Sequence, residues 1–241
     1  MSILDYTAFS LINGLAGRSI TFDKIMVAIV DQPLLKGGLM MALIWWLWFK
    51  ETDDTKSRFA RESILATIAA CFFSLFSARI LVNSLPFRIR PICDPSVPII
   101  MPSGWHRQVL ESWSSFPSDH AVMFFTLAVG IFFISRIIGA LVLVYVTVII
   151  CFPRIFLGLH YPSDVLAGAL LGTFFAVVFN QQVLRHYIAK PFNYWMLKSA
   201  GLFYGVCFLL TFEMAVLFDD IRFLAEKAFN SLGLIAYSAP F

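Results

Sequence analysis

Long apolar runs, separated by short polar segments, dominate the chain and set its expected fold. A helix that crosses the hydrocarbon core of a bilayer needs about 20 mostly apolar residues. Six stretches reach or approach that length, and we expect spans at about 34–49, 64–85, 121–135, 137–157, 165–184 and 194–218. The pattern therefore predicts an all-α fold, a polytopic membrane helical bundle with about six transmembrane helices.

The first 31 residues carry two shorter apolar patterns. The first runs from Ile3 to Ile12 and ends at Asn13, and the second runs from Thr21, its expected N-cap, to about Val30. Both are too short to span a membrane, so we expect interfacial N-terminal helices that lie on its surface. No repeat, linker or low-complexity segment divides the chain, and we expect a single domain over residues 1–241.

Basic residues collect in the short loops on one side of the expected bundle. These residues are Lys50, Lys56, Arg58, Arg61, Arg136, Arg185 and Lys190. Because cytoplasmic loops carry an excess of Lys and Arg, we expect that side to be cytoplasmic. The long 86–119 loop and the 158–164 loop would then face the periplasm or exterior.

Composition excludes several classes of protein. The chain is 59% hydrophobic and only 14% charged, against roughly 25% charged residues in a soluble domain, and its mean hydropathy is +0.81. Such a chain cannot cover a water-exposed surface with charge, and it is too apolar for intrinsic disorder. The net charge of +3 is too small and too dispersed to indicate nucleic-acid binding.

The cysteines and the N-terminus add little to this picture. Three of the four cysteines, Cys71, Cys151 and Cys207, lie in apolar runs, and Cys93 lies in a polar loop without an evident partner. We therefore expect no disulfide and no cysteine-based metal site. The N-terminus lacks the basic segment and cleavage site of a signal peptide, so none is expected.

Three polar clusters stand at the expected outer face of the bundle. They are Arg88-Ile-Arg90-Pro, the segment Ser115-Phe-Pro-Ser118-Asp119-His120, and the stretch that holds Arg154, His160 and Asp164. Polar side chains at membrane depth are expensive and are retained mainly for function. Their common side makes these clusters the candidate functional site.

This set of side chains suits phosphoryl transfer. Guanidinium groups match the geometry of phosphate, and His120 opens a helix, where main-chain N–H groups attract anions. His160 and Asp164 are four residues apart, so a carboxylate could orient the imidazole, either along one helix face or, because Pro162 intervenes, through a turn. Two histidines, one of them oriented by Asp, suit a nucleophile and a general acid.

The order Arg-Pro, then Pro-Ser-x-His, then Arg-x5-His-x3-Asp resembles the type 2 phosphatidic acid phosphatase (PAP2) superfamily. Within it, the Phe-Pro-Ser-Asp-His variant is similar to bacterial members that resemble undecaprenyl-diphosphate phosphatases. The resemblance implies a nucleophilic His160, an orienting Asp164, and a His120 that protonates the leaving oxygen. It also implies no metal and no cofactor. The implied phosphate ligands are Arg90, Ser118, Arg154 and the main-chain N–H of Asp119, with Arg88 as a further cation.

The sequence departs from the family pattern at three positions. The usual lysine of the first motif is Asn83, so either Arg88 supplies the missing cation or phosphate binding is weaker. The usual glycine before the motif histidine is Asp119, whose charge would repel phosphate unless Arg88 or Arg107 pairs with it. The usual serine before Arg154 is Pro153.

The resemblance implies an integral membrane phosphatase in the bacterial inner (plasma) membrane, acting on a lipid phosphate, most simply undecaprenyl diphosphate. A phosphatidate or phosphatidylglycerophosphate phosphatase and a lipid phosphotransferase remain open, as does a non-enzymatic binding or transport protein that would not need the His160–Asp164 pair. The intramembrane Glu213 is a further candidate, which would either serve function or pair with Arg79. The sequence gives no indication of the oligomeric state.

Overall fold

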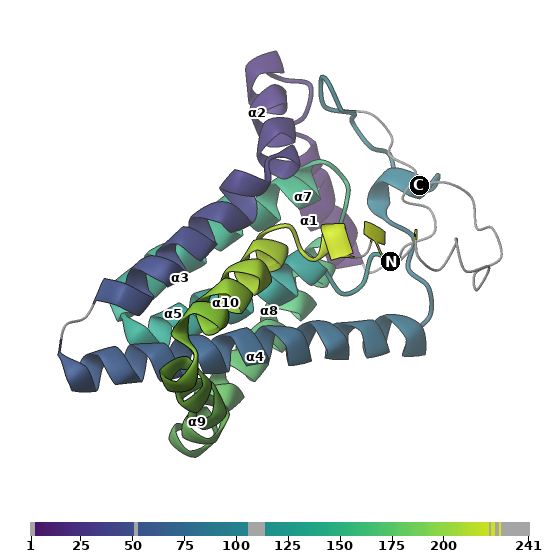
Figure 1. Ribbon diagram of the computed structural model, residues 1–241. Helices are drawn as coiled ribbons and strands as arrows, with labels where there is room; N and C mark the ends of the chain where they lie inside the picture. The colour runs from purple at the N-terminus through teal and green to yellow at the C-terminus, as the bar shows by residue number, and fades with distance from the viewer. Residues whose placement is uncertain (1–2, 51–52, 106–113, 222, 225–226, 228–241) are drawn as a thin grey trace.

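The computed structural model describes residues 3–50, 53–105, 114–221, 223–224 and 227 (Figure 1). Helices joined by turns and loops make up this part of the chain, and it contains no strand. The helices are α1 (Ile3–Asn13), α2 (Ile20–Asp31), α3 (Leu39–Lys50), α4 (Asp54–Ser84), α5 (Asp119–Ile134), α6 (Arg136–Tyr145), α7 (Phe152–Phe156), α8 (Pro162–Phe179), α9 (Gln182–Lys198) and α10 (Ala200–Ala215), with the short turns η1 (Leu34–Gly38), η2 (Pro91–Cys93) and η3 (Val146–Cys151). The expected all-α class is confirmed.

Helix α5 forms the centre of the bundle. It packs most extensively on α8, and it also packs on α4 and α6. Its side chains are apolar on every face, and Met123, Phe124 and Leu127 are fully buried. A helix that is hydrophobic all round belongs in the interior. In Figure 1 the long α4 runs across the lower part of the bundle, with α3 and α10 slanting above it and α9 below it.

Two glycines let α8 lie directly against α5. A Cβ atom at Gly168 would meet the Ser118 carbonyl oxygen at 2.6 Å, and one at Gly172 would meet the Val122 carbonyl oxygen at 2.3 Å. Small residues at such spacing allow the backbones of membrane helices to approach closely. This contact brings the N-terminal end of α5 to the N-terminal end of α8, where two of the three polar clusters lie.

Among the described residues, three helical segments are long and apolar enough to cross a membrane. They are α4, the continuous stretch Arg136–Phe156 and α8, and the pair Ile20–Asp31 and Leu34–Lys50, which is bent by 70°, could add a fourth. The apolar helices α5 and α10 are shorter than these. The expected count of about six spans is therefore not confirmed and stays a prediction.

Some helix ends differ from those expected. Ser19, not Thr21, caps α2, because its extended backbone (φ −146°) lets its side chain accept the Phe22 N–H. The expected span at 194–218 is interrupted at Ser199, whose non-helical backbone (φ −153°, ψ 73°) separates α9 from α10. The expected span at 165–184 ends earlier, at Phe179.

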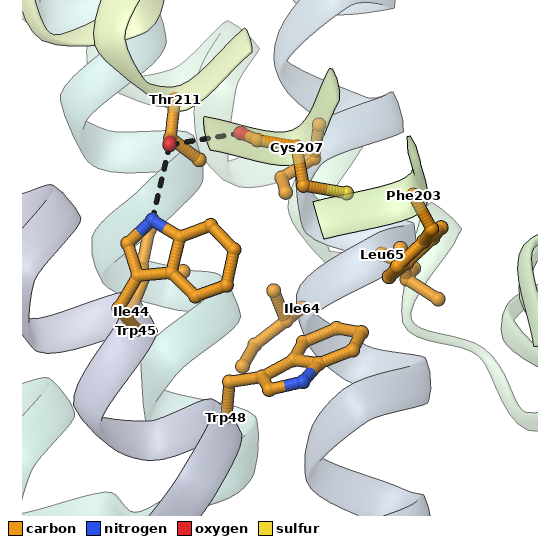
Figure 2. Close-up of a pocket in the computed structure, with 9 residues that line it drawn as sticks. Ile44, Trp45, Trp48, Ile64, Leu65, Phe203, Cys207 and Thr211 are labelled. Atoms are coloured by element: carbon orange, nitrogen blue, oxygen red, sulfur yellow. Dashed lines mark hydrogen bonds between the residues drawn. The ribbon is translucent and has the colours of Figure 1, made fainter. Parts of the chain in front are cut away.

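Helix α10 is joined to α3 by a polar contact inside the bundle (Figure 2). The Trp45 indole Nε1 donates to the Thr211 hydroxyl at 3.1 Å, and that hydroxyl donates to the Cys207 carbonyl oxygen at 2.9 Å. A cavity of about 20 Å³ lies beside Trp45 and Trp48, which is room for little more than one water molecule. The contact therefore fastens α10 without forming a ligand pocket.

The close approach of α8 to α5 gives a test of the packing. We expect Gly172→Ala to cost about 1–3 kcal/mol, because the added methyl group would press on the Val122 carbonyl oxygen. The measurement is the thermal unfolding midpoint of the detergent-purified protein. Gly205→Ala on α10 is the matched control, because nothing lies within 4 Å of its added carbon. Equal losses in the two variants would contradict the packing argument.

Candidate active site

Main-chain hydrogen bonds tie the three polar clusters together. The Ser118 N–H donates to the Asp164 carbonyl oxygen at 3.1 Å, and the Ser115 N–H donates to the Arg88 carbonyl oxygen at 2.8 Å. The Ile92 N–H donates to the Gly158 carbonyl oxygen at 2.9 Å. Segments that lie far apart in the sequence thus meet at one end of the bundle, as the sequence indicated.

The chain reverses sharply between Arg154 and His160. Helix α7 ends at Phe156, and Gly158 adopts a positive φ of 75°, a conformation that glycine reaches without strain. The Leu159 N–H then donates to the Arg154 carbonyl oxygen at 2.9 Å. This turn places Arg154 and His160 close together although they belong to different elements.

His160 and Asp164 meet across the start of α8 and not along one helix face. Pro162 begins the helix, Tyr161 is its N-cap, and Asp164 caps it by accepting the Tyr161 N–H at 2.7 Å. His160 therefore precedes the helix, and its Nδ1 lies 3.8 Å from Asp164 Oδ2. Of the two arrangements left open by the sequence, the structure has the turn.

The partner of the His160 ring is a main-chain carbonyl group. Nδ1 of His160 lies 2.9 Å from the Ser115 carbonyl oxygen. Because a carbonyl oxygen only accepts, Nδ1 carries the proton and Nε2 keeps its lone pair. The Ser115 hydroxyl donates to Asp164, so the carboxylate also holds the residue that orients the ring. This role of Ser115 was not expected from the sequence.

Cations surround this imidazole. Arg154 and His160 are both buried, and Arg90 donates to the Leu159 carbonyl oxygen at 3.0 Å. Burial lowers the pKa of His160; the positive charges of Arg90 and Arg154 lower it further, against the opposing effect of Asp164. Burial likewise lowers the pKa of Arg90. The ring is therefore held neutral beside two guanidinium groups.

In the described part of this region, the buried Nε of Arg154 and the buried hydroxyl of Ser118 have no hydrogen-bond partner. Buried polar groups are nearly always satisfied, so each such group needs an explanation. Both residues are among those that the sequence assigned to phosphate binding, and a tetrahedral oxyanion offers the acceptors that they need.

The structure places Arg88 between two carboxylates. One guanidinium nitrogen donates to Asp164 and, at 2.8 Å, to the Ser163 hydroxyl, and the other donates to Asp5. The guanidinium carbon lies 4.4 Å from the centre of the Tyr161 ring. Arg88 was expected to contact phosphate, but its guanidinium group is held by the carboxylates of Asp5 and Asp164. Asp5 was not among the expected site residues, although a carboxylate in an apolar N-terminal helix is itself an indication of function.

Asp119 forms an ion pair with Arg79 of α4, and not with Arg88 as the sequence suggested. The other expected partner, Arg107, lies outside the described residues. The negative charge that replaces the family's glycine therefore has its own cation. His120 follows in the first turn of α5, with its ring 6.2 Å from that of Phe124.

The remaining departures have structural explanations. Pro153 lies in the first turn of α7, where the missing N–H costs little. The π-helical turn η3 precedes it, with the Phe152 N–H donating to Thr147. Asn83 is exposed near the end of α4. Glu213 accepts a hydrogen bond from the main chain of Ile221 at 3.3 Å, while Arg79 pairs elsewhere.

Within the part of the chain that the structure describes, no group of three or more His, Cys, Asp or Glu side chains is arranged to hold a metal ion. The four cysteines are free thiols. The arrangement that remains is a neutral histidine, a carboxylate, buried guanidinium groups and a second histidine on a helix start. Together these can bind an oxyanion and attack it.

Comparison with known proteins places this arrangement in a family. The chain is similar to the Escherichia coli (strain K12) protein YbjG, with 24% identity over 209 residues, 86% of this chain and 93% of that protein. It is 26% identical over 176 residues to the undecaprenyl-diphosphatase BcrC of Bacillus subtilis (strain 168), covering 73% and 82% of the two chains. The bacitracin transport permease protein BcrC of Bacillus licheniformis is 29% identical over 177 residues, 73% of this chain and 79% of that protein.

A solved structure shares the fold. The crystal structure of Aquifex aeolicus LpxE aligns with a TM-score of 0.51 and 24% identity, over 74% of this chain and 95% of that one. Residues 67–188 match the PAP2 superfamily, and this range includes all three polar clusters. The resemblance seen in the sequence is thereby confirmed, and the chain belongs to the PAP2 superfamily.

Proposed function

We propose that this protein is an integral membrane phosphatase that hydrolyses undecaprenyl diphosphate through a phosphohistidine on His160, without a metal ion. The observation that carries the proposal is the buried His160 ring. Its Nδ1 is bound to a carbonyl oxygen, and unpartnered donors of Arg154 and Ser118 lie in the same cluster of segments. Phosphoryl transfer needs a nucleophile with a free lone pair and nearby hydrogen-bond donors that can bind the phosphate oxygens.

In the first step, Nε2 of His160 attacks the terminal phosphorus and forms a P–N bond. The bond from phosphorus to the bridging oxygen breaks, and His120 gives its proton to that leaving oxygen, so undecaprenyl phosphate departs. Nδ1 keeps its proton throughout and donates it in a hydrogen bond to the Ser115 carbonyl oxygen. Arg90, Arg154, Ser118 and the main-chain N–H of Asp119 hold the equatorial oxygens, where charge develops.

In the second step, water attacks the phosphorus of the phosphohistidine. His120, now neutral, takes a proton from that water as the P–N bond breaks, and inorganic phosphate leaves. The ring nitrogen regains its lone pair. Arg88 acts here as a positioning residue, because its donors are used by Asp5 and Asp164.

The segment before η2 is the proposed path of a lipid tail from the bilayer. Its residues Leu85, Phe87 and Ile89 expose 43%, 55% and 45% of their surfaces, while Arg88 and Arg90 are partly buried. Alternate residues of an extended segment point to opposite sides. A polyisoprenoid chain lying on the apolar side would present its phosphates to the arginines.

The site is proposed to face the periplasm or exterior. Arg58 and Arg61 lie near the start of α4, whereas the site lies beyond its end at Ser84. Near the start of α4, Glu62 is buried and pairs with Arg58 at 3.0 Å and with Arg185 at 3.8 Å. The basic loops and the site thus lie at opposite ends of a helix about 46 Å long, which supports a cytoplasmic position for the loops.

The names of relatives support the substrate class. The Bacillus subtilis relative is named an undecaprenyl-diphosphatase. A phosphatidate or phosphatidylglycerophosphate would fit the same chemistry. So would transfer of the phosphoryl group to a lipid acceptor in place of water.

Phosphate release tests the proposal directly. We expect the detergent-purified protein to release phosphate from undecaprenyl diphosphate in EDTA, faster than from phosphatidate or phosphatidylglycerophosphate. His160→Ala should lose at least about 10³-fold in kcat, because the nucleophile is absent. His186→Ala is the matched control, since His186 lies beside Glu62 at the other end of α4.

The outcomes separate the alternatives. Equal release by wild type and His160→Ala would overturn the phosphohistidine mechanism. Loss of activity in EDTA that returns with added metal would overturn metal independence. Release from phosphatidate alone would transfer the proposal to the phosphatidate class. Binding of the lipid phosphate without release, in a protein indifferent to His160→Ala, would favour a binding or transport protein.

The pH dependence follows from the lowered pKa of His160. The ring must be neutral to attack, so kcat/KM should fall as the pH drops through that pKa. Because burial and the arginines lower the pKa from 6.5, we expect the acid limb of the profile to have its midpoint below 6.5. A midpoint at or above the value of free histidine would contradict a buried, neutral nucleophile.

A further inference from the structure

Asp5 is a buried carboxylate that lies outside the part of the chain matched by the family. It is on α1, only 5% exposed, while the family match begins at residue 67. Its neighbours Ile3 and Leu4 are 85% and 83% exposed, so the apolar side chains of this turn face outward and the carboxylate faces inward. Burying a carboxylate is expensive unless it is paired, which requires an account of its partners.

Asp5 is fully engaged with the start of α8. It accepts the Ser163 N–H at 3.0 Å and the Ser163 hydroxyl at 2.6 Å, and it pairs with Arg88. Burial by itself would raise the pKa of Asp5, but these hydrogen bonds and the Arg88 charge outweigh it and lower the pKa. Asp5 is therefore ionised at neutral pH.

Arg88 connects Asp5 to the proposed catalytic carboxylate. Its guanidinium group donates to Asp5 with one nitrogen and to Asp164 with the other. A planar guanidinium offers donors in a fixed fork, so the position of one carboxylate constrains the other. Two carboxylates and one guanidinium leave this group of three with one net negative charge next to His160.

We propose that Asp5 is a positioning residue for the phosphoryl-transfer site, which acts on Asp164 and His160 through Arg88. The inference rests on the proposed function and adds Asp5, a residue of the N-terminal helix, to the proposed site. Without Asp5, the positive charge of Arg88 would neutralise Asp164, and the guanidinium would lose the anchor that sets its direction. With Asp5 in place, the negative charge that stabilises a cationic imidazole is preserved.

The charges around His160 decide the direction of the expected effects. Asp164 comes from α8, Arg154 from α7, Arg88 and Arg90 from the segment before η2, and Asp5 from α1. Attack on phosphorus places positive charge on the ring, which the two carboxylates favour and the three arginines oppose. Loss of the Asp5 charge therefore disfavours both protonation and phosphorylation of His160.

The test compares Asp5→Asn with Asp23→Asn. Asp23 is also a buried N-terminal carboxylate, but its hydrogen-bond partners among the described residues are the N–H groups of Gly17 and Ser103. The first readout is the NMR titration of labelled histidine in the protein without substrate, with His160→Gln to assign the signal. The second is kcat and KM for undecaprenyl diphosphate.

In Asp5→Asn we expect the His160 midpoint to fall by about half a pH unit. We also expect kcat to drop by up to about 10²-fold with KM little changed. Asp5→Glu should restore most of the activity, and Asp23→Asn should leave the titration midpoint unchanged. A His160 midpoint and kcat in Asp5→Asn that equal those of wild type, or that match Asp23→Asn, would overturn the inference.

Two further arms keep the test decisive. If Asp5→Asn does not fold, the double variant Asp5→Asn/Arg88→Gln removes both charges, so the His160 midpoint should stay near that of wild type while kcat falls. Wild-type kcat in that double variant would overturn the inference. A wild-type protein that releases phosphate from none of the lipids overturns the proposed function, whereas the titration still reports on Asp5.

Discussion

The buried carboxylate of Asp164 joins four separate parts of the chain. It accepts the Tyr161 N–H at the start of α8, the Ser115 hydroxyl from the loop before α5, and the guanidinium of Arg88, which in turn holds Asp5 of α1. Its main-chain oxygen accepts the Ser118 N–H. An ionised carboxylate with no exposed surface costs several kcal/mol unless such partners are present. The same contacts that make the burial tolerable therefore assemble the site.

This assembly depends on the packing of α8 against α5. In lipid the hydrophobic effect does not drive helices together, so helix association depends on close backbone packing and on polar contacts between the helices. Gly168 and Gly172 provide the close backbone contact. The Thr126 hydroxyl adds a polar link, because it lies 2.7 Å from the Val122 carbonyl oxygen and 3.2 Å from the Gly172 carbonyl oxygen. The glycines place the chain at Ser118 directly on α8, one turn from Asp164. Helix packing and site geometry are thus the same constraint.

The sequence predicted the helical class, the three clusters and the family, because apolar run length and motif order are local properties. It did not predict Asp5, the Ser115 carbonyl group as partner of His160, or the pair of Arg79 with Asp119. Each of these partners is chosen by tertiary contact; Asp5 and Arg88 are 83 residues apart in the chain. The break at Ser199 was missed for a related reason, since nothing in the apolar composition of 194–218 indicates where a helix ends.

The departures from the family pattern compensate one another. Asn83 leaves the first motif without its usual lysine, and Asp119 adds a negative charge where a glycine is usual. Arg79 lies one turn before Asn83 on α4, so both residues share a face of that helix. Arg79 therefore places a cation on the helix face that lacks the usual lysine, and this cation pairs with the additional carboxylate of Asp119. Arg88 is likewise used by Asp5 and Asp164, so the proposed function assigns phosphate binding to Arg90 and Arg154 and not to Arg88. Helix α4 with Arg79 and helix α1 with Asp5 thereby supply the partners that balance the charges of Asp119 and Arg88.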